Sequence, residues 1–330
     1  MRISKVYVTS RSFGLYSEGA LELVKSVAEI ERSPYDRAMS EEELLKVVED
    51  FDGLIVGGDR INRRIIEHAK KLEIIARHGV GVDNIDLKAA TDNGVIVTFT
   101  PYANAESVAD FAMGSILSAA RRIPQACLST KQGKWEATKF MGTEVYGKTI
   151  GIIGLGEIGY RVAKRARGFD MRILYWSRRR KINLEKELNA QYVNLETLLR
   201  ASDFVTLHVA LTDETRGMIG EKEFNLMKKT AYFINTARGP IVDEGALYKA
   251  LTEKKITGAA TDVYSKEPPS ADFPLFTLDS VVVSPHIAAY TVETISRMDM
   301  MNAEDIVKVF KEEKPQHVAN TEVLERIRLK

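Results

Sequence analysis

The sequence predicts an α/β fold with two domains, each built on a doubly wound parallel sheet. Short apolar runs alternate with amphipathic segments along the chain, which is the rhythm of strands and covering helices in a parallel sheet. One glycine-rich turn joins an apolar run to a helix-forming segment, as at the start of a βαβ unit. A length of 330 residues with 45% hydrophobic residues supplies ordinary cores for two domains.

Apolar runs in the first hundred residues predict the strands of the first sheet. The segments between them are amphipathic with a helical period. Ser40, with Glu43 three residues later, forms a capping box that begins one of these helices. Pro101 ends this half of the chain. The predicted strands cover residues 6–8, 54–56, 73–76 and 95–97.

A long helical pattern over residues 106–122 is expected to cross into the second domain. After the last strand of that domain the pattern turns helical again over residues 292–311, so this helix should return to pack on the first domain. We therefore predict a first domain of residues 1–101 plus 289–330 and a second domain of residues 102–288. Strands of the second sheet are predicted at residues 150–153, 173–176, 204–208, 231–235, 258–262 and 281–284.

Composition excludes several classes of function. Lys and Arg number 47 against 46 Asp and Glu, so no overall field favours nucleic acid or an anionic membrane. The single cysteine, Cys127, excludes an internal disulfide and a multi-cysteine metal site, and we expect no metal. The start lacks a signal-peptide core, and no stretch approaches the roughly 18 apolar residues of a membrane span. We expect a cytoplasmic globular protein.

Gly154, Gly156 and Gly159 form a Gly-x-Gly-x-x-Gly turn between a predicted strand and a predicted helix. In that setting one glycine makes the tight turn, one lets the backbone approach a pyrophosphate, and one allows close packing of helix on strand. The helix N-terminus then offers unpaired N–H groups to the phosphates. The same glycines also suit a turn that binds nothing, but the strand–turn–helix context favours a dinucleotide.

The end of the next predicted strand indicates which dinucleotide. A protein that binds NAD usually places Asp or Glu there, where it accepts a hydrogen bond from the ribose 2′-OH. This chain has Ser177 followed by four cations, residues 178–181, which suit a 2′-phosphate better than a neutral ribose. NADP(H) is therefore favoured and NAD(H) stays possible. The alternative is a solvated basic surface run.

Three residues near predicted strand ends suggest acid–base chemistry on an acid substrate. Arg238 follows a strand directly, where ligands bind in such sheets, and its guanidinium can hold a carboxylate by two bonds. The alternative is that Arg238 has a purely structural role and forms an ion pair with Asp243 or Glu244. Glu267 and His286 follow the next two strand candidates. A carboxylate beside a histidine stabilises the protonated ring and gives a proton donor near neutral pH.

The chain resembles the D-isomer-specific 2-hydroxyacid dehydrogenase family through six motifs in the family's order. They cover most of the region from residue 50 to residue 290. The resemblance implies a Rossmann-like NAD(P)-binding domain inserted into a discontinuous, flavodoxin-like substrate domain, and a homodimer formed chiefly by the cofactor domains. The motifs are residues 79–86, 154–159, 208–216, 235–240, 262–268 and 285–286.

The resemblance also implies a role for each site residue. Arg238 would hold the substrate carboxylate and carbonyl oxygen, His286 would exchange the hydroxyl proton, and Glu267 would keep His286 protonated. Substrate contacts would further include Arg77, Val80, Gly81 and Asn104, with the amides of Val80 and Gly81 on the carboxylate. Asp262 would contact the nicotinamide amide. The implied cofactor contacts are Gly154, Gly156, Glu157, Ile158, Gly159, Ser177, Arg178, Arg179, His208, Val209, Thr215, Thr236, Ala237, Asp262 and His286.

Two clues to the substrate disagree. Arg77 and the residues after it look like the phosphoglycerate dehydrogenase branch, where an arginine helps to bind the substrate phosphate, yet Gly57-Gly58 stands where that branch offers another arginine. The Ser177-Arg178 pair is similar instead to glyoxylate/hydroxypyruvate reductases. We expect a reductase of small 2-oxo acids, with a D-3-phosphoglycerate dehydrogenase lacking a regulatory domain as the alternative.

Two further hypotheses have less support from the residues. Some proteins of this fold serve as nucleotide-sensing transcriptional corepressors, but this chain shows no long partner-binding extension. Formate dehydrogenases normally place glutamine beside the histidine, where this chain has Glu267.

Overall fold

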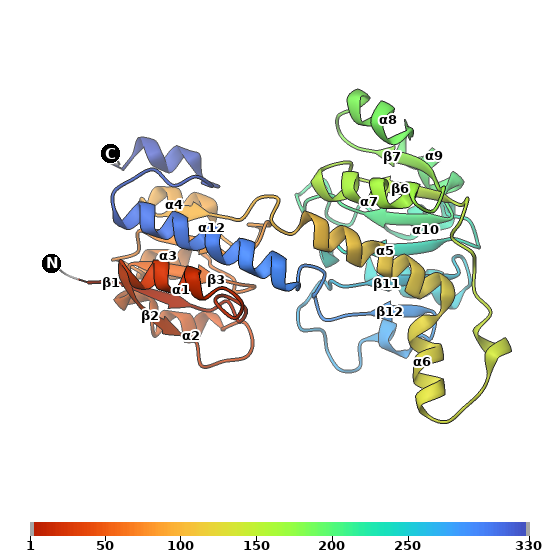
Figure 1. Cartoon of the computed structure of the whole chain (residues 1–330), viewed down its shortest axis with the longest axis horizontal. Helices are drawn as coiled ribbons and strands as arrows, with labels where there is room; N and C mark the ends of the chain where they lie inside the picture. The colour runs from red at the N-terminus through yellow and green to blue at the C-terminus, as the bar shows by residue number, and fades with distance from the viewer. Residues whose placement is uncertain (1–2, 328–330) are drawn as a thin grey trace. The chain divides into compact units, whose positions relative to one another are not determined.

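A computed structural model describes residues 3–327, and the chain divides into two compact units (Figure 1). Unit 1 comprises residues 1–104 and 290–330, and unit 2 comprises residues 105–289. The boundaries expected from the sequence, after residues 101 and 288, lie three residues and one residue from these limits. Each unit is a parallel sheet with helices on both faces, so the chain has the predicted α/β fold of two doubly wound domains. No helix within residues 3–327 is long and apolar enough to cross a membrane.

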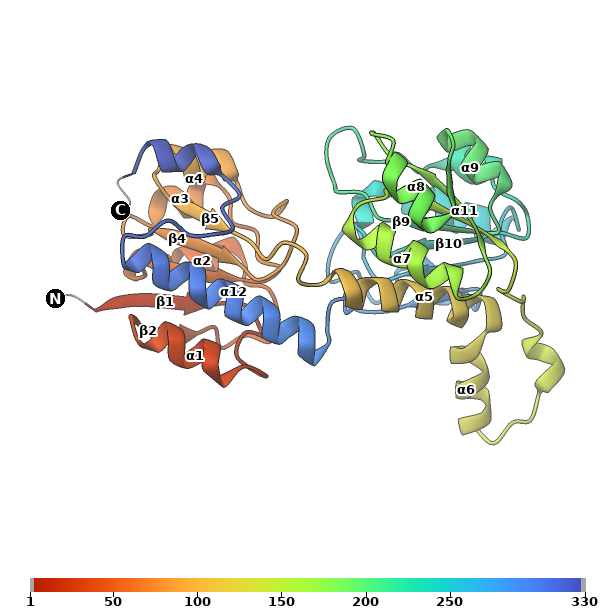
Figure 2. The same cartoon turned by 45° about the horizontal axis from the view of Figure 1, so that its top comes forward.

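Unit 1 contains a five-stranded parallel sheet in the order β2-β1-β3-β4-β5. One face is covered by α2, α3 and α4, and the other by α1 and by α12, which returns from the end of the chain (Figure 2). The strands are β1 (Ser4–Val8), β2 (Ala28–Arg32), β3 (Gly53–Val56), β4 (Ile74–Arg77) and β5 (Ile96–Thr98). The helices are α1 (Glu18–Lys25), α2 (Glu41–Leu45), α3 (Arg63–His68), α4 (Leu87–Asp92) and α12 (Val292–Phe310), with 3-10 turns η1 (Val48–Asp50) and η5 (Thr321–Glu325).

Unit 2 contains a seven-stranded parallel sheet in the order β12-β11-β10-β9-β6-β7-β8. The strand order reverses between β9 and β6, which is the switch point of a doubly wound sheet. The strands are β6 (Thr149–Ile153), β7 (Arg172–Trp176), β8 (Ala190–Tyr192), β9 (Phe204–Leu207), β10 (Tyr232–Asn235), β11 (Gly258–Thr261) and β12 (Val281–Val283). The helices are α5 (Ala105–Arg121), α6 (Ile123–Lys131), α7 (Glu157–Arg167), α8 (Ile182–Leu188), α9 (Leu195–Ala201), α10 (Glu221–Leu226) and α11 (Glu244–Thr252), with 3-10 turns η2 (Ala137–Phe140), η3 (Gly239–Ile241) and η4 (Pro274–Thr277).

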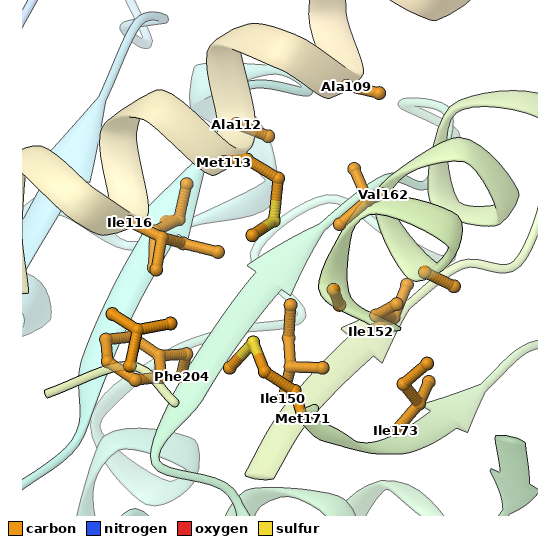
Figure 3. Packing of buried hydrophobic residues seen from close by; sticks show 14 of the residues in the cluster. Ala109, Ala112, Met113, Ile116, Ile150, Ile152, Val162, Met171, Ile173 and Phe204 are labelled. Carbon is orange, nitrogen blue, oxygen red and sulfur yellow. The ribbon is translucent and has the colours of Figure 1, made fainter. Parts of the chain in front are cut away.

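The helices of unit 2 bury their apolar faces against the sheet. Figure 3 shows Met113 and Ile116 of α5 directed towards the sheet residues Ile150 and Phe204, in a cluster that also includes Val162 of α7. The central strands β9, β10 and β11 are buried along their whole length, as expected for strands covered on both faces. This packing fixes the carboxyl ends of the strands, where the candidate site residues begin.

The sequence prediction differs from the structure at two edge strands and one helix. It missed β2 and β8, whose polar residues lie exposed at the sheet edges and break the apolar pattern. The helix predicted over residues 106–122 ends at Arg121, because Arg122 has a left-handed backbone with φ of 53°. A second helix, α6, follows, and α6 with the chain after it extends away from the sheet of unit 2 (Figure 1, Figure 2).

Candidate active site

Six strands of unit 2 deliver predicted site residues to a single edge of the sheet. All the strands are parallel, so their carboxyl ends meet at that edge, where open α/β sheets bind ligands. The acid–base and arginine residues follow β10, β11 and β12, and the glycine turn and the basic run follow β6 and β7, across the switch point. In sheet order, the residues are His286 after β12, Asp262 after β11, Arg238 after β10, His208 after β9, Gly154 after β6 and Ser177 after β7.

The glycine turn has the geometry that a pyrophosphate needs. Gly154 has φ of +101°, and a Cβ there would overlap the carbonyl oxygen of His208. A Cβ on Gly159 would overlap the carbonyl oxygen of Gly154, so helix and strand pack too closely for a side chain. At Gly156, the residue before α7, a Cβ would meet no atom within 4 Å. Packing therefore explains two glycines, while the open space at Gly156 fits a phosphate approaching the helix N-terminus.

His286 and Glu267 form a close pair at the surface of unit 2. The ring Nδ1 of His286 lies 2.6 Å from Oε2 of Glu267, and the two side chains are 44% and 36% exposed. Burial alone would raise the pKa of Glu267, but the hydrogen bond and charge of His286, with the charge of Arg238 behind them, lower it. The carboxylate therefore stays ionised and fixes Nδ1 of the ring. Nε2 has no partner within residues 3–327, so it can exchange a proton with a ligand.

Asp262 holds the turn that presents His286. His286 has a left-handed backbone, with φ of 55°, which is unfavourable for a residue with a Cβ. The buried carboxylate of Asp262 accepts hydrogen bonds from the hydroxyl of Ser284 at 2.6 Å and from the amides of Ile287 at 2.9 Å and Ala288 at 2.8 Å. A carboxylate has about four acceptor positions, so one remains for the predicted nicotinamide contact.

Tyr264 links the segment that precedes His286 to the loop that carries Glu267. The hydroxyl of Tyr264 donates to the carbonyl oxygen of Ser284 at 2.9 Å, and its amide donates to Oε1 of Glu267, also at 2.9 Å. Burial raises the pKa of Tyr264 to about 12, so the hydroxyl remains a donor. The sequence did not predict the roles of Tyr264 and Ser284, because nothing in it indicates a hydrogen bond between two residues that are 20 positions apart.

Arg238 begins a turn that packs on the loop carrying Glu267. A Cβ on Gly239 would overlap the backbone of Tyr264, so the two loops touch through bare main chain. Asn235 fixes the turn from inside, accepting from the amide of Ala237 at 3.0 Å and donating to the carbonyl oxygen of Arg238 at 3.1 Å. The carboxylates considered as structural partners of Arg238 accept backbone amides: Asp243 that of Ala246, and Glu244 that of Ser265.

The residues after β9 are suited to line a ligand site. Burial lowers the pKa of His208 to about 3, so its ring is neutral, and Nε2 lies 2.9 Å from the hydroxyl oxygen of Thr206. Nδ1 of His208 and the hydroxyl of Thr236 are buried and have no hydrogen-bond partner within residues 3–327. Such orphaned groups are uncommon and mark a place where a ligand can bind. Val209 follows directly, and the hydroxyl of Thr215 closes the loop by donating to the carbonyl oxygen of Ala210 at 2.7 Å.

The basic run after β7 divides into two parts. Arg178 and Arg179 are exposed, and within residues 3–327 neither has an ion-pair partner. Arg180 instead binds Glu185 through two bonds of 2.8 and 2.9 Å. The hydroxyl of Ser177 donates to the carbonyl oxygen of Arg179 at 2.6 Å and shapes the turn. The predicted 2′-phosphate contacts Ser177, Arg178 and Arg179 thus lie in one tight turn.

The substrate residues predicted in unit 1 lie mainly in one loop after β4. Arg77 is half-buried and folds back over the loop, where its guanidinium donates to the carbonyl oxygens of His78 and, at 2.9 Å, of Gly81. Gly79 has φ of +154° and lies directly beneath that guanidinium. Val80 and Gly81 are half-buried, and half-buried Asn104 immediately precedes α5. Arg77 therefore braces the loop that carries the predicted carboxylate-binding amides.

Comparison with known proteins gives a family. The family model described as "D-isomer specific 2-hydroxyacid dehydrogenase, NAD binding domain" matches residues 113–288. A glyoxylate reductase of Korarchaeum cryptofilum is 46% identical over 86% of this chain and 87% of its own length. A D-3-phosphoglycerate dehydrogenase of Methanocaldococcus jannaschii is 45% identical over 92% of this chain, which spans only 57% of that protein. The crystal structure of a glyoxylate reductase from Paecilomyes thermophila aligns with a TM-score of 0.85 at 29% identity, covering 97% of this chain and 99% of that one.

Proposed function

The chain belongs to the D-isomer specific 2-hydroxyacid dehydrogenase family, an oxidoreductase family acting on 2-hydroxy acids, and on this premise we propose that it reduces glyoxylate and hydroxypyruvate with NADPH. The observation that carries the proposal is the arrangement of Arg238, Glu267 and His286 at the sheet edge that also holds the glycine turn. This arrangement offers an anion-binding group, a proton donor and a dinucleotide site along one edge.

Each residue of the set has a task in reducing a 2-oxo acid. The glycine turn at residues 154–159 would hold the dinucleotide, whose nicotinamide would supply a hydride for the C2 carbon of the acid. His286 gives the proton on Nε2 to the carbonyl oxygen, so the product is the 2-hydroxy acid. Glu267 stabilises the protonated ring before transfer, and Arg238 binds the carboxylate and polarises the carbonyl.

Small 2-oxo acids suit the chain better than phosphorylated ones. The guanidinium of Arg77 is engaged with carbonyl oxygens of its own loop, which supports a bracing role over phosphate binding. A relative at 46% identity, from Korarchaeum cryptofilum, is named a glyoxylate reductase, an enzyme that reduces a small 2-oxo acid. Oxidation of 3-phosphoglycerate remains the second candidate, favoured by the presence of an arginine at position 77.

NADPH is the proposed cofactor because of the turn after β7. Arg178 and Arg179 are exposed cations beside Ser177, where an acidic residue would select NADH. Two charge-assisted bonds to the 2′-phosphate, at about 1.5–3 kcal/mol each before screening, would favour NADPH by at least roughly tenfold.

Steady-state kinetics test both parts of the proposal. We expect kcat/KM to be higher for glyoxylate and hydroxypyruvate than for 3-phosphohydroxypyruvate, and higher with NADPH than with NADH. Arg77→Ala is the control for phosphate binding: if Arg77 only braces its loop, all three acids lose similar activity. Efficient oxidation of 3-phosphoglycerate, or a selective loss of 3-phosphohydroxypyruvate in Arg77→Ala, would support the second candidate instead. Higher kcat/KM with NADH would refute the cofactor assignment.

A homodimer formed through unit 2 completes the proposal. Large apolar side chains lie exposed along α6 and the chain after it, among them Leu128, Met141 and Trp135, which is 89% exposed. Exposed apolar groups gathered on an extended segment favour a protein–protein interface. We expect a dimer by sedimentation, and a monomer for Leu128→Ser with Trp135→Ser. A parent protein that sediments as a monomer would exclude this assembly.

A further inference from the structure

The turn that carries the basic run is held from beneath by a buried tyrosine. Tyr175, on β7, is fully buried, and its hydroxyl donates to Oε1 of Glu185 at 2.5 Å. The same hydroxyl oxygen accepts the amide of Lys181 at 2.9 Å, so it bonds to both the turn and α8. Burial, with the bond to Glu185, raises the pKa of Tyr175 to about 12, and the hydroxyl therefore remains a donor.

Glu185 joins this hydroxyl to the last arginine of the run. Its carboxylate takes two bonds from the guanidinium of Arg180, and the hydrogen bonds from Arg180 and Tyr175 lower the pKa of Glu185 to about 2. The guanidinium also lies over the ring of Tyr192, 5.8 Å from its centre. A two-bond pair with a stacked ring leaves Arg180 little freedom to reach a ligand.

The helix that supplies Glu185 is itself tied to α7, whose N-terminus would meet the pyrophosphate. Glu187 of α8 accepts a hydrogen bond from the hydroxyl of Tyr160, and its carbonyl oxygen accepts from Arg167 at 3.0 Å. The glycine turn and the basic run are therefore fixed to the same short helix. A dinucleotide must meet both at a set separation, so the position of α8 matters for recognition.

We propose that Tyr175, Glu185 and Arg180 are positioning residues for cofactor selection: they hold the 177–181 turn so that Ser177, Arg178 and Arg179 meet the 2′-phosphate, and Arg180 does not touch it. This inference rests on the proposed preference for NADPH. Arg180, one of the four consecutive cations, then acts through the carboxylate of Glu185 and not by binding the phosphate.

Binding measurements on the full-length protein separate positioning from contact. The dissociation constants of NADPH and NADH are measured by nicotinamide fluorescence at several salt concentrations for the parent, Tyr175→Phe, Arg180→Gln and Arg178→Ala. Lys186→Gln removes an exposed charge from α8 and serves as the matched control. Amide hydrogen exchange at Lys181 reports the turn directly, without cofactor.

The expected results differ among the variants. Arg178→Ala should weaken NADPH binding and reduce its dependence on salt, because a phosphate contact is lost. Tyr175→Phe and Arg180→Gln should weaken NADPH by roughly 3- to 10-fold, the scale of one net hydrogen bond, while keeping the salt dependence and leaving NADH within about twofold. The double variant Tyr175→Phe with Arg180→Gln should bind NADPH only slightly more weakly than the single variant with the lower affinity, because both residues act through Glu185. Lys186→Gln should resemble the parent, and Lys181 should exchange faster in Tyr175→Phe.

Several outcomes would overturn the inference. A reduced salt dependence in Arg180→Gln would make Arg180 a phosphate ligand. Equal losses for NADPH and NADH would reduce the network to general stability, and unchanged NADPH binding in Arg180→Gln would remove its role even if Tyr175→Phe proved unstable. Failure of the cofactor proposal shows itself differently, because the parent would then bind NADH at least as tightly as NADPH.

Discussion

The pair of His286 with Glu267 in unit 2 and the pair of His78 with Asp299 in unit 1 have similar chemistry and differ in almost everything else. In unit 2, His286 lies 2.6 Å from Glu267, with the side chains 44% and 36% exposed. In unit 1, His78 lies 2.8 Å from Asp299, with the side chains 2% and 0% exposed. The surface pair follows two strands at the ligand edge of its sheet, and the buried pair joins β4 to α12.

The two pairs differ in free bonding capacity, which the proposed acid–base role of His286 requires and which the buried pair lacks. Nδ1 of His78 lies 3.0 Å from the hydroxyl of Ser10, and the second oxygen of Asp299 accepts the amide of Gly14 at 2.9 Å. Burial lowers the pKa of His78, although the bond to Asp299 opposes this, so the ring is neutral and both nitrogens are occupied. His286 keeps Nε2 available for a ligand. A line of Ser10, His78 and Asp299 resembles a nucleophile triad, but its burial leaves no access for a substrate.

Removing the surface histidine should produce the largest loss of activity. His286→Ala deletes the proton donor, so kcat/KM for 2-oxo acid reduction should fall by roughly 10²- to 10⁴-fold. Its side chain contributes little packing, so the melting temperature and NADPH affinity should stay close to those of the parent. A residual rate within tenfold of the parent would show that another group supplies the proton.

Removing the carboxylate of the buried pair should lower the free energy of unfolding much more than removing the carboxylate of the surface pair. Asp299→Ala leaves the buried His78 ring and the half-buried Gly14 amide without an acceptor, at up to about 1–3 kcal/mol each, so the free energy of unfolding should fall by about 2–6 kcal/mol. Glu267→Ala breaks an exposed pair, which is typically worth at most about 1 kcal/mol. Urea unfolding of both variants measures the contrast. Equal losses would mean that burial does not distinguish the pairs.

The positions of the proposed site residues could be predicted from the sequence because these residues directly follow apolar strands. Arg238 and His286 stand next to runs that identify strand ends, and a parallel sheet brings such ends to one edge. The order of the strands, and hence which residues become neighbours, was not visible in the runs themselves. The structure supplies that order.

The buried network could not be predicted, because no local pattern connects its members. His78 and Asp299 are 221 residues apart, and the apolar period of the last helix gives no sign that one acidic side chain points inwards. Asp262 shows the same limit: the sequence suggested a cofactor contact, while the structure adds three bonds that hold the His286 turn. Polar partners depend on tertiary packing, which periodicity does not encode.

The role of Glu267 should appear in the pH dependence of catalysis. Glu267→Gln keeps the size of the side chain and removes the negative charge beside His286, so the protonated ring is less favoured. The basic limb of kcat/KM for reduction should therefore move to lower pH, with a smaller loss at acidic pH, where the ring stays protonated. Asp299→Asn, at the buried pair, serves as the control and should leave the limb in place. A Glu267→Gln profile that overlays the parent would exclude the assigned role.

The buried pair should instead appear in the pH dependence of stability, and this effect is the smallest. An unfolded histidine binds a proton below its ordinary pKa of 6.5, whereas the lowered pKa of His78 keeps the folded ring neutral to lower pH. Between these two values the unfolded chain binds more protons, so the free energy of unfolding decreases as the pH falls. His208, whose pKa is lowered to about 3, contributes with the same sign.

His78→Asn should therefore reduce the slope of stability against pH below 6.5 by at most about 1.4 kcal/mol per pH unit, the value for one proton, and leave the part due to His208. Urea unfolding at a series of pH values measures these slopes. A variant as acid-sensitive as the parent would show that His78 takes up its proton in the folded state and that the buried pair is an ion pair.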